Sequence, residues 1–380
     1  MASGSIQKRQ GARGPAYRVR VEYPPDPVTG DRRQRSETFK IRRAAETALS
    51  AWLTEIERGT ALEPSKTTVA ELLDRWLMDE APKTTRASTL VGYEITIRKH
   101  LKPVLGHCVV QKLTVEQVEH FYAQKRAEGL ASSTVKKCHL RLSAALNLAV
   151  RWGLSTRNVC QSAKPGKVTY KKPKVWSIED GEAFLEVANR DGMHPFWMLA
   201  LESGMRRGEL LGLRWSDVNW DRSAVHVQQE VVALRGVPII QEPKTPESRR
   251  TVRLAGHVMA ELRRHKVQWA ERKLQATEWT DHDLVFCTAT SRPINPAHVR
   301  RSFDRIVARA GVPDITIHGM RHCHAVWLLR AGTPVKVVSE RLGHKDITTT
   351  LNVYAAALPD MQDHAIEVLD RLMGRSAQAS

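Results

Sequence analysis

Long apolar runs and paired cysteines are missing from this chain of 380 residues. No apolar stretch approaches the roughly 18 to 20 residues of a membrane-spanning helix, and the polar segment from Met1 to Gln10 has no signal-peptide core. The five cysteines are odd in number and widely scattered, with no Cys-x-x-Cys pair, which argues against a disulfide framework and a cysteine zinc site. We therefore expect a cytoplasmic protein with buried, reduced thiols and no membrane partner.

Acidic residues are scarce beside basic ones. Asp and Glu number 41 against 59 Lys and Arg, which gives a formal net charge of +18. A chain this basic is expected to bind a polyanion, and because it has no membrane-anchoring segment, nucleic acid is the leading candidate. The length allows two or three domains.

Residues 1–62 are expected to form a small sheet-plus-helix domain. Apolar and polar residues alternate from Tyr17 to Tyr23, which predicts a half-buried strand; a second strand is expected at 33–39 and a helix after it. The first 43 residues carry eleven Lys or Arg against four Asp or Glu. Because these charges alternate with apolar positions, a sheet face lying in a DNA groove is favoured over a solvated basic face. The candidates for DNA contact are Arg18, Arg20, Arg33 and Arg35.

Residues 67–160 are expected to form a compact all-helical domain. Thr68 and Thr114 each stand three residues before a Glu or Gln, a pattern that predicts capped helix starts. A basic linker is expected at 161–174, where Pro and Gly prevent regular structure and lysines favour an extended segment along a phosphate backbone. The candidates for phosphate contact are Lys136, Lys137, Lys171 and Lys172, although exposed lysines are also common without such a role.

Residues 175–380 are expected to be mostly helical with one small antiparallel sheet. Strands at 225–227 and 237–240 are predicted to flank a turn at Arg235 and Gly236, and a third strand follows at 251–254. Apolar residues recur at helical spacing from Met361 to Met373, which predicts an amphipathic tail helix. The expected fold class is therefore multidomain and mainly α, with a small sheet plus helix, an all-helical domain, and a mixed α+β domain.

Two basic motifs in this last region have a phosphate-binding character. Arg206 stands just past Gly204 at an expected helix start, where its guanidinium could present two N–H groups to a phosphate while Glu209 fixes the local backbone. The alternative is an ordinary surface salt bridge between Arg206 and Glu209. Lys244 lies between two expected strands and could reach a groove and lend a proton, or it could be one more exposed turn lysine.

A histidine-rich motif follows. His318, Arg321 and His322 share one helical face. The His-x-x-x-His spacing is typical of zinc, but Arg321 would place a positive charge beside the cation, so an anion site is favoured. We expect His324 to pack in the core.

The third motif ends in a tyrosine. A helix is expected to end near Gly343, leaving His344 exposed on the turn, and Tyr354 follows ten positions later. A lone Tyr after a helix is usually a packed residue, yet this one lies downstream of two candidate phosphate sites. Tyr354 is therefore a candidate nucleophile.

These motifs together resemble the tyrosine recombinase family of the phage-integrase type. Gly204 to Leu210 resembles the family's first arginine box, Lys244 with Thr245, Ser248 and Arg250 its hairpin-lysine box, and His318-x-x-Arg321-His322 its second arginine box. Leu342-Gly343-His344 and Tyr354 resemble the terminal box in residue type, order and spacing. Gly319, where an acidic residue is frequent, and Cys323-His324 depart from the pattern.

The resemblance implies a site-specific DNA recombinase, an integrase of a phage or other integrative element. It implies that 1–62 binds arm-type DNA sites, that 67–160 binds core-type sites, and that 175–380 is catalytic. Tyr354 would attack the scissile phosphate to form a 3′-phosphotyrosyl link, without ATP, metal or other cofactor. Arg206 and Arg321 would clamp the phosphate, His318 and His344 would bind its oxygens, and Lys244 would act as general acid. Glu209 and His322 would support these groups.

The expected partners follow from the same resemblance. They are double-stranded DNA and three further copies of the chain, in a tetramer that passes through a Holliday junction at the nucleoid. The resemblance leaves room for a DNA-bending host factor and a directionality factor. Two alternatives stay open, a DNA-binding protein of the same fold that has lost catalysis and a type IB topoisomerase.

Overall fold

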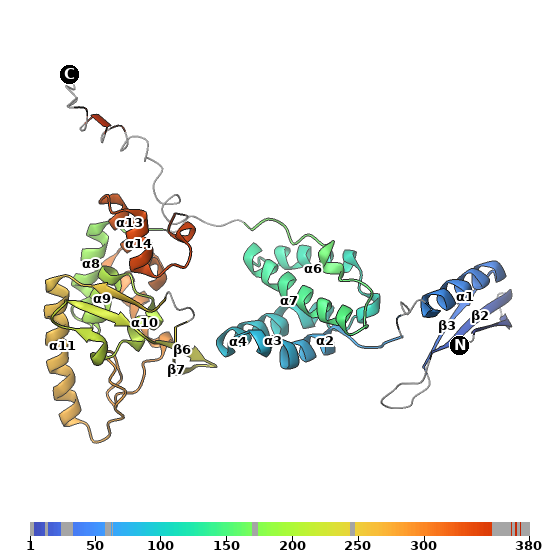
Figure 1. The fold of residues 1–380 in the computed structure, drawn as a ribbon, viewed down its shortest axis with the longest axis horizontal. Helices are drawn as coiled ribbons and strands as arrows, with labels where there is room; N and C mark the ends of the chain where they lie inside the picture. The colour runs from blue at the N-terminus through green and yellow to red at the C-terminus, as the bar shows by residue number, and fades with distance from the viewer. Residues whose placement is uncertain are drawn as a thin grey trace. The chain divides into compact units, whose positions relative to one another are not determined.

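The computed structural model describes residues 4–11, 14–23, 33–57, 62, 64–168, 174–243, 248–351, 366, 369–370 and 373. Four of the candidate residues lie outside these described residues, as does most of the expected tail helix: Lys171, Lys172, Lys244 and Tyr354. The chain divides into two compact units, Met1–Thr169 and Tyr170–Ser380, and Figure 1 labels many of their elements. Within the described part of the chain, no helix has the length and apolar character needed to cross a membrane.

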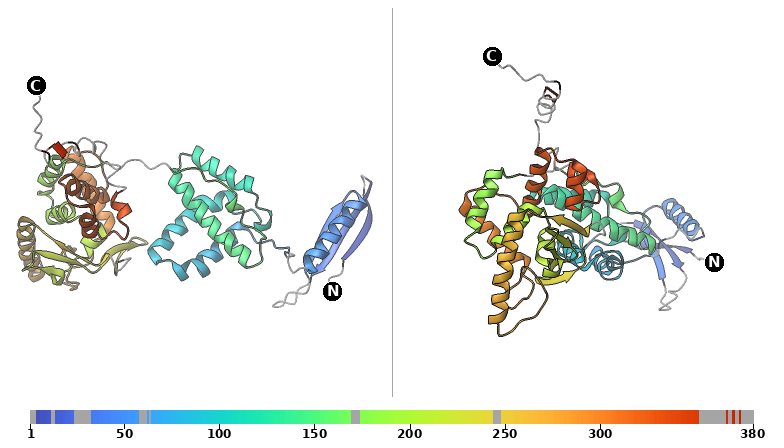
Figure 2. Two further views of the ribbon diagram at one scale, coloured as in Figure 1. Left: turned by 45° about the horizontal axis from the view of Figure 1, so that its top comes forward. Right: turned by 60° about the vertical axis from the view of Figure 1, so that its left-hand side comes forward.

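A three-stranded antiparallel sheet covered by one helix begins the first unit (Figure 2). Its strands lie in sequence order, β1 (Gly4–Gly11), β2 (Gly14–Tyr23) and β3 (Arg33–Phe39), and α1 (Arg42–Glu57) packs on one face. The strands β2 and β3 and the helix confirm the prediction. Strand β1 is an addition, because a polar edge strand shows little apolar alternation, yet it pairs with β2 from Gly4 opposite Val21 onward.

Helices alone form the rest of the described first unit. They are α2 (Val69–Arg75), α3 (Ala81–Thr84), α4 (Ala87–Thr96), α5 (Lys102–Leu105), α6 (Val115–Ala127) and α7 (Ser132–Arg151), with π-helical turns at Trp76–Glu80 and Ile97–Leu101 and 3-10 turns at Val110–Lys112 and Val159–Gln161. The capping boxes of Thr68 with Glu71 and of Thr114 with Gln117 are confirmed. Their apolar faces bury one shared core that includes Leu72, Phe121 and Leu142.

The second unit packs helices around two small sheets. Its helices are α8 (Ile178–Ala188), α9 (His194–Ser203), α10 (Arg207–Gly212), α11 (Gly256–Gln275), α12 (Pro296–Ala310), α13 (Ile317–Arg330) and α14 (Val335–Leu342). Strands β4 (Val218–Asn219), β5 (Ala224–Val227) and β8 (Arg250–Arg253) form one sheet in that order, and β6 (Glu230–Leu234) and β7 (Val237–Gln241) form a separate hairpin. The rings of Trp176, Phe184, Trp197 and Phe303 pack against one another in its core.

The predicted single strand cluster is wrong in its pairing. Segment 230–234 rather than 225–227 pairs across the turn with 237–241, because Arg235 and Gly236 both have positive φ, as a two-residue hairpin turn requires. Segment 225–227 pairs instead with 250–253. This second pairing places Arg250 and Val252 on the inward face of β8, and Thr251 and Arg253 on its outward face.

Candidate functional site

Arg206 is the cap residue just before the short helix α10, and Glu209 holds it there. The backbone N–H of Arg206 donates to Glu209 Oε2 at 2.8 Å, and its guanidinium Nη1 donates to Oε1 at 2.7 Å. The Glu209 side chain is only 2% exposed, so this pair is not the surface salt bridge of the alternative interpretation. The Arg206 side chain keeps 34% of its surface open. Glu209 thus fixes both the backbone and the head group of a partly accessible arginine.

Arg321 is buried in the first turns of α13, with 2% of its surface exposed. Its Nη1 donates to the carbonyl of Gly204 at 2.8 Å, and its Nη2 donates to the carbonyl of Leu342 at 2.6 Å. Burial first, then the positive charge of Arg206, lower the pKa of Arg321 to about 9. The guanidinium therefore stays charged at neutral pH in a site without a carboxylate of its own.

Gly204 makes this arrangement possible. It ends α9 in the left-handed conformation, with φ of 63°, and an added Cβ would lie 2.7 Å from both His324 and Leu342. Only glycine fits such a backbone in so small a space. The residue therefore allows α9, α13 and α14 to meet and presents its carbonyl to Arg321.

Three successive carbonyls at the end of α14 each accept a hydrogen bond from a different arginine. Arg250 Nε donates to Arg341 O at 2.7 Å, Arg321 Nη2 to Leu342 O, and Arg206 Nη2 to Gly343 O at 3.4 Å. The last carbonyls of a helix have no partner within it and carry partial negative charge, so cations are favoured there. The three arginines are thus brought together by the turn that leads into His344.

His344 and His318 complete the cluster. His344 is half-buried rather than exposed as expected, because its Nδ1 is hydrogen-bonded to the buried Thr350 hydroxyl at 2.8 Å. Desolvation by the surrounding protein, then the charge of Arg321, lowers the pKa of His344 to about 4. Desolvation, then the charges of His322 and Arg321, lowers the pKa of His318 to about 4, although His318 remains exposed to solvent. Both imidazoles are therefore neutral at pH 7 and can donate or accept one hydrogen bond.

The two following histidines differ from each other. The rings of His318 and His322 meet edge to face with 4.7 Å between centroids, beside the site. His324 is 5% exposed and packs in the core as expected. Its Nδ1 is bonded to Leu201 O at 2.9 Å, and its Nε2 accepts from Arg341 Nε at 3.0 Å. Among the described residues, no group of three or more His, Cys, Asp or Glu is placed to hold a metal ion.

In the sequence, Arg250 was named only as part of the hairpin-lysine box, and Arg341 was not singled out. Arg250 Nη2 donates to Glu209 Oε2 at 2.9 Å, so Glu209 is shared between Arg250 and Arg206. Burial opposes ionisation of Glu209, but the charges of Arg250 and Arg206 outweigh it, and the pKa of Glu209 lies below its ordinary value. Arg341 donates to carbonyls of Arg253 and Glu202. The signal for Arg250 was its alternation with Val252 along a strand, which points both inward.

The arginines of the N-terminal sheet divide between its two faces. Arg18 and Arg20 alternate with the buried Val19 and Val21 and therefore lie on the face away from α1. Arg35 lies opposite Val21, on the helix side, where its guanidinium stacks over Trp52 at 4.0 Å and pairs with Glu55. Strand register thus removes Arg35 from the outward group of DNA-contact candidates. The side chain of Arg33 lies outside the described residues.

The helical part presents its candidates on α7. Lys137 is exposed and Lys136 half-buried, and both lie in the first turns of the helix. Nearby, Arg141 stacks on the ring of Tyr93 at 3.5 Å. The N-terminal half of α7 thus carries three basic side chains, of which Lys137 is exposed.

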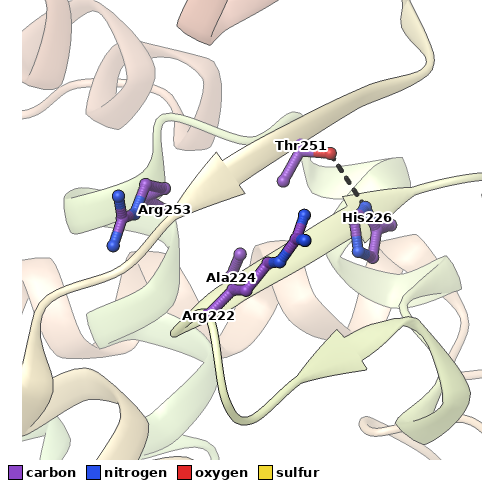
Figure 3. A pocket seen from close by; sticks show the side chains of 5 residues that line it. All are labelled: Arg222, Ala224, His226, Thr251 and Arg253. Carbon is purple, nitrogen blue, oxygen red and sulfur yellow. Dashed lines mark hydrogen bonds between the residues drawn. The ribbon is translucent and has the colours of Figure 1, made fainter.

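A separate pocket of about 450 Å³ lies on the outward face of the β4-β5-β8 sheet (Figure 3). His226 Nδ1 is hydrogen-bonded to the Thr251 hydroxyl at 2.8 Å across β5 and β8, as Figure 3 shows. The lining residues are Arg222, Ala224, His226, Thr251 and Arg253. Arg250, on the opposite face of β8, takes no part in this pocket.

Comparisons with known proteins give a consistent result. Residues 183–361 match the Phage integrase family, and residues 68–125 match the Phage integrase, N-terminal SAM-like domain. A tyrosine recombinase XerC-like protein of Caldanaerobacter subterraneus is 29% identical over 356 residues, which cover 88% of this chain and 90% of that protein. The ICEBs1 integrase of Bacillus subtilis is 25% identical over 359 residues, covering 94% and 97%.

Solved structures share the fold. A Tn1549 transposon integrase fragment in complex with circular intermediate DNA has a TM-score of 0.67 at 21% identity, covering 80% of this chain and 99% of that one. A lambda integrase in a tetramer bound to a Holliday junction has a TM-score of 0.57 at 20% identity, covering 88% and 91%. The chain therefore belongs to the phage integrase family of tyrosine-type site-specific recombinases.

Proposed function

We propose that this protein cuts and rejoins DNA at specific sites through a covalent 3′-phosphotyrosyl intermediate on Tyr354. The observation that carries the proposal is the convergence of Arg206, Arg321, His318 and His344 from α10, α13 and the turn after α14. Such a set of donors suits the scissile phosphate of a DNA strand, because negative charge grows on its non-bridging oxygens in the transition state.

The two arginines and two histidines would divide the work. Arg321, charged and buried, would bind one non-bridging oxygen, and Arg206, held by Glu209 but partly open, would bind the other. His318 and His344 are neutral at pH 7 because their pKa values lie near 4. Each can therefore donate a hydrogen bond to phosphate, as the arginines do, and can also accept a proton, which the arginines cannot do. Arginine charge around the phosphate would supply the neutralisation that a metal ion gives in other phosphoryl-transfer sites.

Tyr354 and Lys244 would supply the covalent and proton-transfer steps. The phenol has an ordinary pKa of about 10, so surrounding positive charge is needed to favour the phenolate. Its proton would pass to a neutral imidazole such as His318. The phenol oxygen would bond to phosphorus while the bond to the 5′-oxygen breaks, and Lys244 would give that 5′-oxygen a proton. Because the phosphotyrosyl bond conserves the energy of the phosphodiester, a 5′-hydroxyl can reverse the step without ATP.

The wider DNA contacts are proposed from the family and from charge. We assign arm-type sites to 1–62, core-type sites to 67–160, a backbone-following linker to 161–174, and catalysis to 175–380. The similarity to integrases of a transposon and of ICEBs1 supports an integrative element as the source. Similarity to a tetramer bound to a Holliday junction supports the same assembly. A bending factor and a directionality factor would be additional partners.

A suicide-substrate experiment tests the proposal. The site is found by sequencing DNA that flanks the gene, and a nicked duplex containing it is incubated with the protein. We expect an adduct that survives denaturation, and Tyr354→Phe should bind the duplex equally but form none. Tight binding by wild type without an adduct would reduce the protein to a DNA-binding member of the fold.

Product topology then separates recombination from relaxation. Two duplexes that each carry the site should yield strands joined between them. Relaxed circles alone, without joined strands, would favour the topoisomerase alternative.

A further inference from the structure

Arg250 links three parts of the catalytic unit. Its side chain is 7% exposed and lies on the inward face of β8. Its Nη2 donates to Glu209 Oε2 on α10 at 2.9 Å, its Nε to Arg341 O at the end of α14 at 2.7 Å, and its Nη1 to Ser248 O at 3.1 Å. One planar guanidinium thus joins the start of β8 to the elements that carry Arg206 and His344.

We propose that Arg250 is a positioning residue of the recombination reaction, which orients Arg206 through the shared carboxylate of Glu209 and fixes the turn bearing His344 through Arg341 O. This inference rests on the proposed function, because it presumes that Arg206 and His344 bind the scissile phosphate. Arg250 itself makes no contact with the phosphate. Each of its three guanidinium nitrogens donates to a protein partner, and its effect on DNA is indirect.

The geometry requires arginine at this position. Its three bonds leave the head group in three directions, and a lysine ammonium on a flexible stem cannot reproduce that planar fork. Without Arg250, the buried Glu209 carboxylate would be hydrogen-bonded to one cation, Arg206, instead of two. A buried carboxylate with too few partners either takes a proton or moves toward solvent. Protonation would leave Arg206 a weaker, neutral acceptor, and movement toward solvent would remove the acceptor of its Nη1 and backbone N–H.

Several charged or titratable groups face Glu209. Arg206 on α10 and Arg250 on β8 contact it directly. On α13, Arg321 and His318 act on it at longer range, since its charge raises the pKa of both. Removal of Arg250 should therefore raise the pKa of Glu209 and leave activity dependent on its ionisation.

Arg253 provides a matched control on the same strand. It lies three residues after Arg250, on the outward face, and its side chain lines the pocket in Figure 3. Arg250→Lys and Arg250→Gln are compared with Arg253→Lys in adduct formation at saturating suicide duplex. We expect Arg250→Lys to slow adduct formation by about 10- to 100-fold and Arg250→Gln by about 100-fold or more, as for loss of other preorganising groups. Arg253→Lys should match wild type.

DNA affinity and folding separate positioning from general damage. In a Tyr354→Phe background, Arg250→Lys should bind the duplex within about 3-fold of its parent, because rate rather than ground-state binding is affected. Its thermal unfolding should stay cooperative. An adduct rate for Arg250→Lys equal to wild type would overturn the inference.

A double-mutant cycle and a pH profile test the path through Glu209. If Arg250 acts through that carboxylate, Arg250→Gln should cost much less in rate when Glu209 is already Gln. Multiplied losses would overturn this path. Arg250→Gln should also regain rate as pH rises through the raised pKa of Glu209, while wild type and Arg253→Lys lack that step. The same rise of adduct rate with pH in Arg250→Gln, wild type and Arg253→Lys would count against the inference.

The parent proposal fails in a different way. If wild type forms no adduct, or Tyr354→Phe forms one normally, the nucleophile assignment is wrong whatever Arg250 does. A wild-type adduct that disappears in Tyr354→Phe, with Arg250 variants at full rate, refutes the positioning role alone.

Discussion

The arginines on the outward face of the N-terminal sheet and those of the candidate site have the same head group but opposite surroundings. Arg18 and Arg20 lie on a face away from the core, where Arg20 pairs with Glu22 and the side chains of that pair are more than two-fifths exposed. Arg250 and Arg321 are nearly fully buried and donate to fixed carbonyls. Exposed pairs contribute little stability, whereas buried charges must be fully paired.

The difference separates attraction from chemistry. An exposed arginine can follow any phosphate, and its contribution falls steeply with salt. A buried arginine whose direction is set before DNA arrives loses little freedom in the transition state, so it can act on rate. We therefore expect substitutions in the cluster to change the reaction rate, and substitutions on the sheet to change salt-dependent affinity.

Arg321→Lys should give the largest effect. A lysine in the same space cannot reach Gly204 O, Leu342 O and a phosphate oxygen at once, so adduct formation should fall by about 10² to 10³-fold. DNA affinity in a Tyr354→Phe background should change by less than about 10-fold, since most phosphate contacts lie elsewhere. Adduct yield with time on a suicide duplex measures the first quantity and gel shift the second. Equal losses in rate and affinity would remove the distinction between the two regions.

Gly204→Ala should destabilise the catalytic unit by about 2 to 4 kcal/mol. The methyl group would meet a positive φ and two close neighbours at 2.7 Å, His324 and Leu342. Gly236→Ala is the control, because its φ of 87° is also positive but nothing lies within 4 Å of an added Cβ. That variant should lose only about 1 kcal/mol. Urea unfolding monitored by tryptophan fluorescence measures both, and similar losses would show that crowding at Gly204 adds nothing.

Local patterns predicted the fold better than long-range contacts did. The capping boxes at Thr68 and Thr114 were predictable because both partners lie within one helical turn. The pairing of 225–227 was not, because its partner strand begins 23 residues later in the sequence and nothing local selects it. Arg35 was grouped with Arg18 and Arg20 as a DNA-contact candidate, because the sequence does not show the register against Val21 that turns it toward the helix side.

The candidate site was predictable in its residues but not in its connections. Arg206, Arg321 and the histidines stand in motifs of distinctive order and spacing. The role of Arg250 depends on partners 41 and 91 residues away, Glu209 and Arg341, which no local pattern brings together. Half-burial of His344 likewise comes from Thr350 and surrounding protein. Sequence order identified the groups, and packing alone determines which of them hold the others.

Acid should destabilise the catalytic unit through His324. Burial, then the charge of Arg341, lowers the pKa of His324 to about 3. In the unfolded chain the pKa of a histidine side chain is about 6.5. Below about pH 6.5 the unfolded state takes up a proton that the folded state refuses, so stability falls as pH falls, by up to about 1.4 kcal/mol per unit. The free energy of unfolding in urea, measured at several pH values between 7 and 4.5, should depend less steeply on pH in His324→Gln than in wild type. The exposed His298→Gln should keep the wild-type slope, and a slope unchanged in both variants would exclude His324 as its source.

Replacing the exposed arginines of the N-terminal sheet should have the smallest effect on the rate of adduct formation. Arg18→Ala with Arg20→Ala should weaken binding to arm-type DNA and make the plot of log affinity against log salt shallower by about 0.9 for each phosphate that these arginines neutralise. The rate of adduct formation at saturating core DNA should not change. Arg35→Ala is the matched control on the adjacent strand, because Arg35 stacks on Trp52 and pairs with Glu55. Its removal should lower the free energy of unfolding by about 0.5 to 1 kcal/mol. The plot of log affinity against log salt should keep its wild-type slope. If Arg35→Ala flattens the salt slope as much as Arg18→Ala does, the face away from α1 is not the one that meets DNA.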